Sequence, residues 1–254
     1  MFAVSQESRG RMKMAKPWQV LTGLLLLPAL PVAAGELVVL VDDSTEMPQA
    51  NIVAGALQDG LHRDIGQELA GQLQRTARFR VLPRKRLIPA LEAGQGDVVC
   101  LALPAWMPAS TLRWSRPFLQ NQDLLLSSRS APPRNRLSDL AGQAIGTVLG
   151  FAYPELQAQL GNRFVRDDAH SMDDSLRKLA AGRVAHAISN RLYLDYQLAH
   201  GLKLPPLQPP LVISSYRMRC ALSARSTLGL AELNRALGRL QQQGAFERML
   251  QHYR

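Results

Sequence analysis

The sequence has little of what metal sites and nucleic-acid surfaces require. Its two cysteines lie far apart, and its five histidines do not cluster with them, whereas a zinc site needs Cys and His ligands at close spacing. The net charge of +10 comes mostly from arginines spread along the chain, and no basic stripe with interleaved aromatic residues occurs. We therefore expect no metal, no cofactor and no nucleic-acid partner, and we interpret the basic excess as a solvated surface.

The chain also lacks an apolar run long enough to cross a membrane. Its longest such run, residues 20–34, is interrupted by two prolines, and a spanning helix needs about 20 apolar residues. Lys13 and Lys16 precede this run, and the small residues 32–34 close it. A basic start, a short apolar core and a small-residue end are typical of a secretory signal. We expect residues 1–34 to be a cleaved signal peptide and the remaining chain to work in the periplasm.

Two points about this leader follow from the residues around it. Met1, Met12 or Met14 could each be the true start, and the sequence leaves the choice open. No cysteine lies directly after the expected cleavage region, so we expect neither a lipid anchor nor stable insertion into a membrane.

The chain has two cysteines, Cys100 and Cys220. In an oxidising compartment, an even number of cysteines suggests a disulfide, with two buried free thiols as the alternative.

Hydrophobic patterning beyond residue 35 alternates between strands and helices. Short apolar runs predict strands, and amphipathic segments between them predict helices. The expected strands are 36–41, 78–82, 97–103, 144–149, 164–166, 184–189 and 211–223, with extended chain at 112–118 and 123–128. The expected helices are 60–75, 86–92, 154–160, 171–181, 191–200, 228–242 and 245–253. This order predicts an α/β fold in which the loops after Val41, Leu103, Leu149 and Ser189 carry the ligand site.

Several short motifs occur in a distinctive order. They are Met47-Pro48, Gly60–Asp64 (GLHRD), Leu87–Gly94 (LIPALEAG), Trp114–Phe118 (WSRPF), Gly182-Arg183-Val184 and the closing segment Leu240–Tyr253. In order and spacing the chain resembles the periplasmic solute-binding protein family 3, the substrate-binding proteins of polar amino-acid ABC transporters, as a divergent member.

This resemblance implies a two-lobed, type II periplasmic-binding-protein-like fold with a hinge of crossover strands. Lobe I would comprise 35–120 plus 221–254, and lobe II would comprise 121–220 including the crossover strands. The protein would be a monomer that captures a small polar solute in the cleft between the lobes. An ABC permease or a sensor protein would be its partner.

The sequence departs from the family where a ligand's charges are usually held. The family's carboxylate-binding Arg falls at Pro108, and its amino-binding Asp falls at Asn190. A bidentate Arg–carboxylate contact is not easily replaced by a neutral side chain. We therefore expect the ligand not to be a standard α-amino acid held in the usual way.

Two of the expected cleft loops belong to lobe I. Asp42, Asp43 and Glu46 follow the first strand and could meet a cationic group, although loop solvation or helix capping is the alternative. Pro104 and Trp106 follow the third strand, where Trp106 could stack on a ligand or pack between the lobes.

The other two expected cleft loops belong to lobe II. Gly150, Phe151 and Tyr153 lie at a glycine turn before a helix, where free backbone N–H groups favour an anion. The two aromatic residues of this loop could instead only pack. Asn190 could hydrogen-bond a neutral polar group or cap the helix that follows it.

The resemblance also bears on the cysteines and on catalysis. In the family fold the return strand lies antiparallel beside the third strand of lobe I, which would bring Cys220 next to Cys100. We expect a non-catalytic receptor with no catalytic residue. A periplasmic enzyme of the dehydratase kind on the same fold and a degenerate clamp that acts through protein contacts remain the alternatives.

Overall fold

A mixed β-sheet runs through residues 36–222. The computed structural model describes residues 1–3 and 35–254, so the predicted signal peptide and its alternative starts lie almost entirely outside the described residues. The strands of the sheet are β1 (Glu36–Asp42), β4 (Thr76–Leu82), β5 (Val98–Ala102), β6 (Arg113–Trp114), β7 (Leu119–Ser127), β8 (Ala144–Val148), β9 (Val165–Ala169), β10 (His186–Asn190) and β11 (Leu211–Leu222). Their order is β4-β1-β5-β11-β7-β10-β8-β9, with β6 paired to β11.

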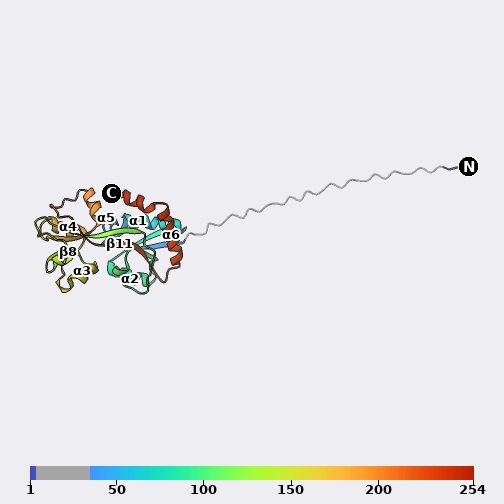
Figure 1. Ribbon diagram of the computed structural model, residues 1–254. Helices are drawn as coiled ribbons and strands as arrows, with labels where there is room; N and C mark the ends of the chain where they lie inside the picture. The colour runs from blue at the N-terminus through green and yellow to red at the C-terminus, as the bar shows by residue number, and fades with distance from the viewer. Residues whose placement is uncertain (4–34) are drawn as a thin grey trace. The chain divides into compact units, whose positions relative to one another are not determined.

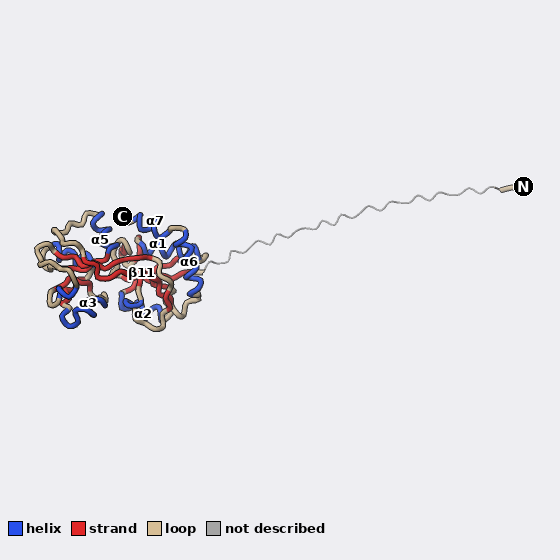
Figure 2. The backbone as a smooth tube through the Cα atoms, viewed as in Figure 1, coloured by secondary structure: helices blue, strands red, loops and turns tan. Residues whose placement is uncertain are grey.

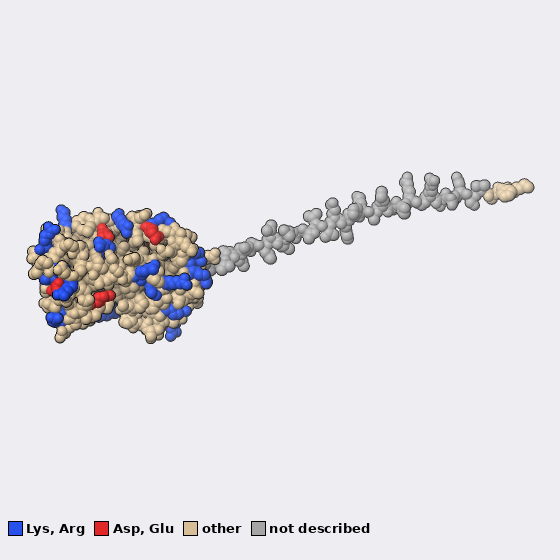
Figure 3. All heavy atoms as spheres, viewed as in Figure 1, with Lys and Arg blue, Asp and Glu red and all other residues tan. Residues whose placement is uncertain are grey.

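Helices cover both faces of this sheet (Figures 1 and 2). They are α1 (Leu61–Gln72), α2 (Arg84–Glu92), α3 (Pro154–Leu160), α4 (Met172–Ala180), α5 (Arg191–Ala199), α6 (Leu230–Gln242) and α7 (Ala245–His252). None of the helices described in residues 35–254 is long and apolar enough to cross a membrane. On the face drawn in Figure 3, Lys and Arg side chains are spread over the molecule instead of forming one stripe.

The first half of the sheet is built around β1, which is parallel to both β4 and β5. The apolar residues 37 and 39–41 of β1 are no more than 1% exposed, as expected for a parallel strand covered on both faces. One hydrophobic cluster packs α1, α6 and α7 on one face, and another packs α2 on the opposite face. These two clusters form the core of lobe I.

The second half repeats this plan with β8 between β9 and β10, both parallel to it. Helices α4 and α5 pack on one face and α3 on the other. Ser171 caps α4 as the sequence predicts, because its side chain accepts a hydrogen bond from the Asp174 N–H. These elements form the core of lobe II.

Two long antiparallel strands, β7 and β11, join the two halves. They pair from Leu211 and Leu125 at one end to Met218 and Leu119 at the other. Strand β11 then continues alongside β5, and β7 pairs with β10. The crossover strands therefore lie where the sequence predicts a hinge.

One pair of strands was not predicted from the sequence. Strands β2 (Asn51–Val53) and β3 (Ala56–Asp59) form a separate hairpin of three and four residues. Its side chains are half-buried or exposed, so the hairpin leaves no apolar pattern long enough to identify it. The extended stretch expected at 112–118 contributes only β6, at Arg113–Trp114.

The cysteines form the predicted disulfide, Cys100–Cys220. It joins β5 to β11 at a bulge, because Ala102 pairs with Arg219 and Val99 with Ala221, which leaves two residues of β5 opposite Cys220. One of those two, Leu101, has a left-handed φ of +54°. The bulge and the disulfide both lie at the point where the hinge strand enters lobe I.

We predict that replacing both cysteines with serine will lower the free energy of unfolding. The closed loop spans 120 residues, for which the chain-entropy model gives a stabilisation of about 4–5 kcal/mol. Urea unfolding of the double variant and of the wild type, with and without reductant, measures the difference. Reduced wild type should resemble the variant, and two free thiols in denatured, unreduced wild type would show that the disulfide is absent in solution.

Candidate ligand-binding cleft

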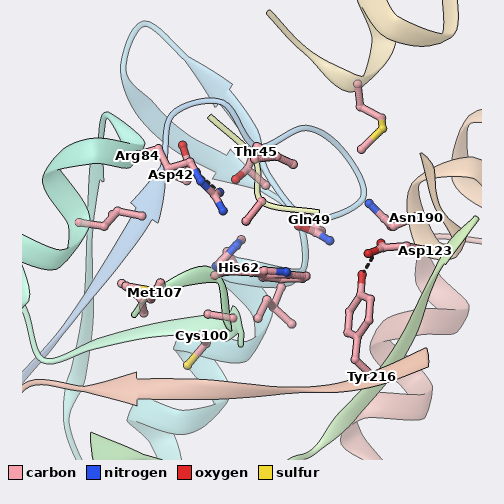
Figure 4. A pocket seen from close by; sticks show the side chains of 18 of the residues that line it. Asp42, Thr45, Gln49, His62, Arg84, Cys100, Met107, Asp123, Asn190 and Tyr216 are labelled. Carbon is pink, nitrogen blue, oxygen red and sulfur yellow. Dashed lines mark hydrogen bonds and ion pairs between the residues drawn. The ribbon is translucent and has the colours of Figure 1, made fainter. Parts of the chain in front are cut away.

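A cavity of about 130 Å³ lies between the two lobes. The space-filling view is indented along its lower edge, where α2 and α3 approach each other in Figure 1. Figure 4 shows the side chains that line the cavity, which come from both lobes and from the hinge strands. The lining residues are Asp42, Thr45, Gln49, His62, Arg84, Leu87, Ile88, Val99, Cys100, Leu101, Ala102, Trp106, Met107, Asp123, Phe151, Ala152, Tyr153, Met172, Ile188, Asn190 and Tyr216.

An ion pair forms one wall of the cavity. Asp42, the last residue of β1, accepts a hydrogen bond from Arg84, the first residue of α2, with Oδ2 and Nη1 2.8 Å apart. The other oxygen of Asp42 accepts hydrogen bonds from the backbone and the hydroxyl of Ser44. The Arg84 guanidinium also lies over the ring of Phe151, 4.4 Å from its centroid, so this pair connects lobe I to lobe II.

A carboxylate without a cationic partner lies on the opposite side, at the hinge. Asp123 on β7 accepts a hydrogen bond from the Tyr216 hydroxyl at 2.9 Å (Figure 4). It accepts a second from the Ser214 hydroxyl at 3.3 Å, and both donors are on β11. No ion pair to Asp123 occurs among residues 35–254. Burial raises the pKa of Asp123 to about 6, although the two hydroxyl hydrogen bonds act in the opposite direction.

His62 supplies a neutral polar group in the cavity wall. Its side chain is 95% buried, and its Nδ1 has no hydrogen-bond partner among the described residues. Burial lowers the pKa of His62 to about 4, against the opposing effect of Asp42. At neutral pH the imidazole is therefore uncharged, and its free nitrogen can bond a ligand.

Aromatic rings border the hinge carboxylate. Trp106 lies on the 3₁₀ turn Pro104–Trp106 that follows β5, and its ring meets the Tyr216 ring edge to face with centroids 5.2 Å apart. Tyr153 lies across the cleft, where its hydroxyl accepts a hydrogen bond from the Val148 N–H. Because that hydroxyl is already bonded within lobe II, Tyr153 presents mainly its ring to the cavity.

Glu46 links the two lobes directly. Its Oε2 accepts hydrogen bonds from the backbone N–H groups of Met172 at 2.9 Å and Asp173 at 3.3 Å, in the first turn of α4. A carboxylate is favoured there because the first N–H groups of a helix have no partner within the helix. Burial raises the pKa of Glu46, although these hydrogen bonds lower it in part.

Asn190 both caps a helix and lines the cavity. Its Oδ1 accepts hydrogen bonds from the Tyr193 N–H and from Asn121 Nδ2. In the sheet, Asn190 is the cross-strand partner of Asp123, so the two side chains share one face. Helix capping therefore accounts for the oxygen of Asn190 and leaves its amide nitrogen as the group available to a ligand.

The structure places only part of the predicted site at the cavity. Trp106, Phe151, Tyr153 and Asn190 line it, whereas Asp43, Pro104 and Gly150 do not. Glu46 lies in a smaller hollow beside it. Pro104 and Gly150 act through the neighbours that they position, because Pro104 begins the turn that carries Trp106, and Gly150 adopts a φ of +80° just before Phe151.

Sequence reasoning named only one of the charged residues of the cavity. Of the acidic residues expected after the first strand, Asp42 lines the cavity at the end of β1, whereas its exposed neighbour Asp43 does not. Arg84 begins a run of three basic residues, 84–86, and from the sequence we interpreted it only as part of the solvated basic surface. Asp123 was assigned to a strand, where its polar side chain in an otherwise apolar run, LLLS, was the available signal.

Comparisons with known proteins support the fold. No protein-family model and no curated protein matches the sequence. Among solved structures, the ligand-binding core of GluR0 in complex with L-glutamate has a TM-score of 0.70 at 15% identity, covering 87% of this chain and 97% of that one. An ancestral amino-acid-binding protein that is a precursor of cyclohexadienyl dehydratase has a TM-score of 0.69 at 16% identity, covering 86% and 95%.

A third structure is similar in the same way. A periplasmic binding protein of Salmonella typhimurium with high arginine specificity has a TM-score of 0.66 at 15% identity, covering 87% of this chain and 99% of that one. At this level of identity the likeness establishes the fold. The chain therefore has the two-lobed, type II periplasmic-binding-protein fold that the sequence motifs predicted.

We predict that Asp123→Asn will stabilise the unliganded protein above pH 6. Because the pKa of Asp123 is raised from 3.8 to about 6, its carboxyl favours folding only when protonated, and this contribution is lost as the pH rises from about 4 through 6. The asparagine oxygen can still accept the hydrogen bonds of Tyr216 and Ser214. The Tm of the variant should exceed that of the wild type at pH 8, with the difference shrinking towards pH 4. Curves of Tm against pH that run parallel for the variant and the wild type would contradict the raised pKa of Asp123.

We predict different effects for two replacements of Glu46. Burial raises the pKa of Glu46, although its hydrogen bonds to α4 lower it in part. The net effect of burial at this position therefore favours the uncharged carboxyl, and this contribution to stability is lost as the pH rises. Glu46→Gln keeps an oxygen acceptor without charge and should keep the lobes closed, whereas Glu46→Ala should open them. Small-angle X-ray scattering measures the change in radius of gyration, with Asp43→Asn as the neighbouring control. Equal behaviour of the two Glu46 variants would show that the contact does not hold the lobes.

Proposed function

We propose that this protein is a periplasmic receptor that captures a small polar solute in the cleft between its lobes. The observation that carries the proposal is the cavity itself, which is bounded by both lobes and by the hinge strands. Three of its polar groups, Asp123, His62 and the amide nitrogen of Asn190, are not fully paired within the protein. Such convergent polar groups in an otherwise apolar cavity are characteristic of ligand sites.

Closure over the ligand follows from the interlobe contacts. Glu46 bonds the start of α4, and Arg84 lies over Phe151. A solute that touches both walls would add to these contacts only in the closed form, and it would thereby shift the equilibrium between open and closed forms. We propose an ABC permease or a sensor protein as the partner that recognises the closed form.

A specific observation favours catalysis as the second candidate function. Asp123 lies in the cavity with a pKa of about 6, which suits a general acid or base near neutral pH. One structural neighbour is a precursor of cyclohexadienyl dehydratase. Conversion of a bound solute, followed by mass spectrometry of the products, would identify an enzyme, whereas an unchanged bound solute supports the receptor.

We predict that a cognate solute will raise the Tm of residues 35–254. The test panel holds amino acids, amines, carboxylates and short peptides. A solute at 100 times its dissociation constant stabilises the folded form by about 2.7 kcal/mol. Trp106→Ala, which alters the cavity wall, should reduce the shift, while Leu198→Ala, at an exposed position outside the cavity, should not. A flat panel together with a stable protein partner would favour a clamp that acts through protein contacts.

A further inference from the structure

The charges of the cavity do not balance. Of its ionisable side chains, Asp42 and Arg84 neutralise each other at 2.8 Å. His62 is held neutral by burial, which lowers its pKa to about 4. The remaining charge is the single carboxylate of Asp123. The cavity therefore carries a net charge of about −1 above pH 6, inside a chain whose net charge is +10.

The carboxylate of Asp123 is placed as a ligand contact. Tyr216 and Ser214 bond it from β11, but hydroxyl donors leave its charge uncompensated. Glu155 at the start of α3 carries a second negative charge, and its repulsion raises the pKa of Asp123 further. A half-buried carboxylate that is kept without a cationic partner costs stability, and a cationic ligand would remove this cost.

The groups around Asp123 fit an organic cation better than an inorganic one. Tyr216 carries the hydroxyl that bonds the carboxylate, and the Trp106 ring contacts the Tyr216 ring in the same cavity wall. Aromatic faces attract ammonium groups that retain apolar substituents. The free Nδ1 of His62 can hydrogen-bond a second, neutral polar group of the same ligand. No group of three or more His, Cys, Asp or Glu side chains placed to hold a metal ion occurs among residues 35–254.

A ligand carboxylate, in contrast, finds no free cation in the cavity. Among residues 35–254, Arg84 is the only arginine that lines it, and none of the described lysines does. Arg84 is engaged by Asp42 on one side and by the Phe151 ring on the other. A zwitterionic amino acid would have to break the Asp42–Arg84 pair or leave its own carboxylate unpaired, and either costs free energy.

We propose that the cleft binds a small organic cation without a carboxylate group, whose ammonium group binds Asp123 next to the contacting rings of Trp106 and Tyr216. This inference rests on the proposed receptor function and specifies the chemical class of its solute. It assigns recognition of the cation to the hinge strands β7 and β11.

The test compares amino acids with the amines obtained by removing their carboxylate. Each pair differs in that one group, and the pairs are lysine with cadaverine, arginine with agmatine, and phenylalanine with phenethylamine. Choline adds a quaternary ammonium ion. Isothermal titration calorimetry on residues 35–254 at pH 8 should give at least one amine that binds 10-fold or more tightly than its parent amino acid.

Variants locate the binding group. Asp123→Asn should weaken binding of that amine on the order of 100-fold, because the ammonium group loses a charge-assisted hydrogen bond in a partly dry site. Glu68→Gln removes one negative charge from the exposed face of α1 and should leave the affinity unchanged. Tyr216→Phe keeps the ring but removes the hydroxyl, and it should weaken binding less than Asp123→Asn does.

The outcomes distinguish a failure of the cation assignment from a failure of the receptor function. Tight binding of an amine that is lost in Asp123→Asn and kept in Glu68→Gln supports both. Tighter binding of an amino acid than of its amine, or of any solute whose affinity is unchanged in Asp123→Asn, overturns the cation assignment and leaves the receptor function standing. No binding by any of these compounds, by a wider panel of neutral and acidic solutes or by peptides overturns both.

Discussion

The antiparallel pairing of β7 and β11 is the constraint on which the rest of the structure depends. These two strands are the elements that belong to both lobes, and they run side by side from Leu119 to Leu125 on one strand and from Met218 to Leu211 on the other. Any relative movement of the lobes must bend or twist this ribbon. The disulfide fixes one end of it, because Cys220 of β11 is bonded to Cys100 of β5. The hinge is therefore anchored firmly in lobe I.

The same pairing concentrates the chemistry of the cleft at the hinge. Asp123 and Tyr216 face each other diagonally across the two strands, and Asn190 is the direct neighbour of Asp123 on β10. Where the family resemblance implies a carboxylate at position 190, this chain has an amide, and the carboxylate stands one strand away. Cross-strand partners share a face of the sheet. A carboxylate on β7 therefore reaches the same cavity as a carboxylate at the partner position on β10 would.

Stability and binding oppose each other in this cleft. Burial raises the pKa values of Asp123 and Glu46, so both carboxylates lower the stability of the unliganded, closed form at neutral pH. The disulfide offsets this loss of stability and adds no charge to the cavity. The apolar clusters of each lobe hold the cavity walls in place. A polar site within a rigid frame suits the proposed receptor function, because the groups of such a site need little rearrangement when a ligand binds.

The sequence by itself determined the alternation of strands and helices, the Ser171 cap and the order of motifs that indicates the two-lobed fold. These features are local, and periodicity and capping residues record them directly. Sequence also located the aromatic loops at Trp106, Phe151 and Tyr153, because they follow buried strands.

Only the tertiary structure decided which charged side chains contact each other. Arg84 reaches Asp42 across 42 residues, and Tyr216 reaches Asp123 across 93, so no local pattern connects them. Their partners, and hence the free charge of the cavity, depend on strand register and lobe contact, which the packing of the whole chain sets.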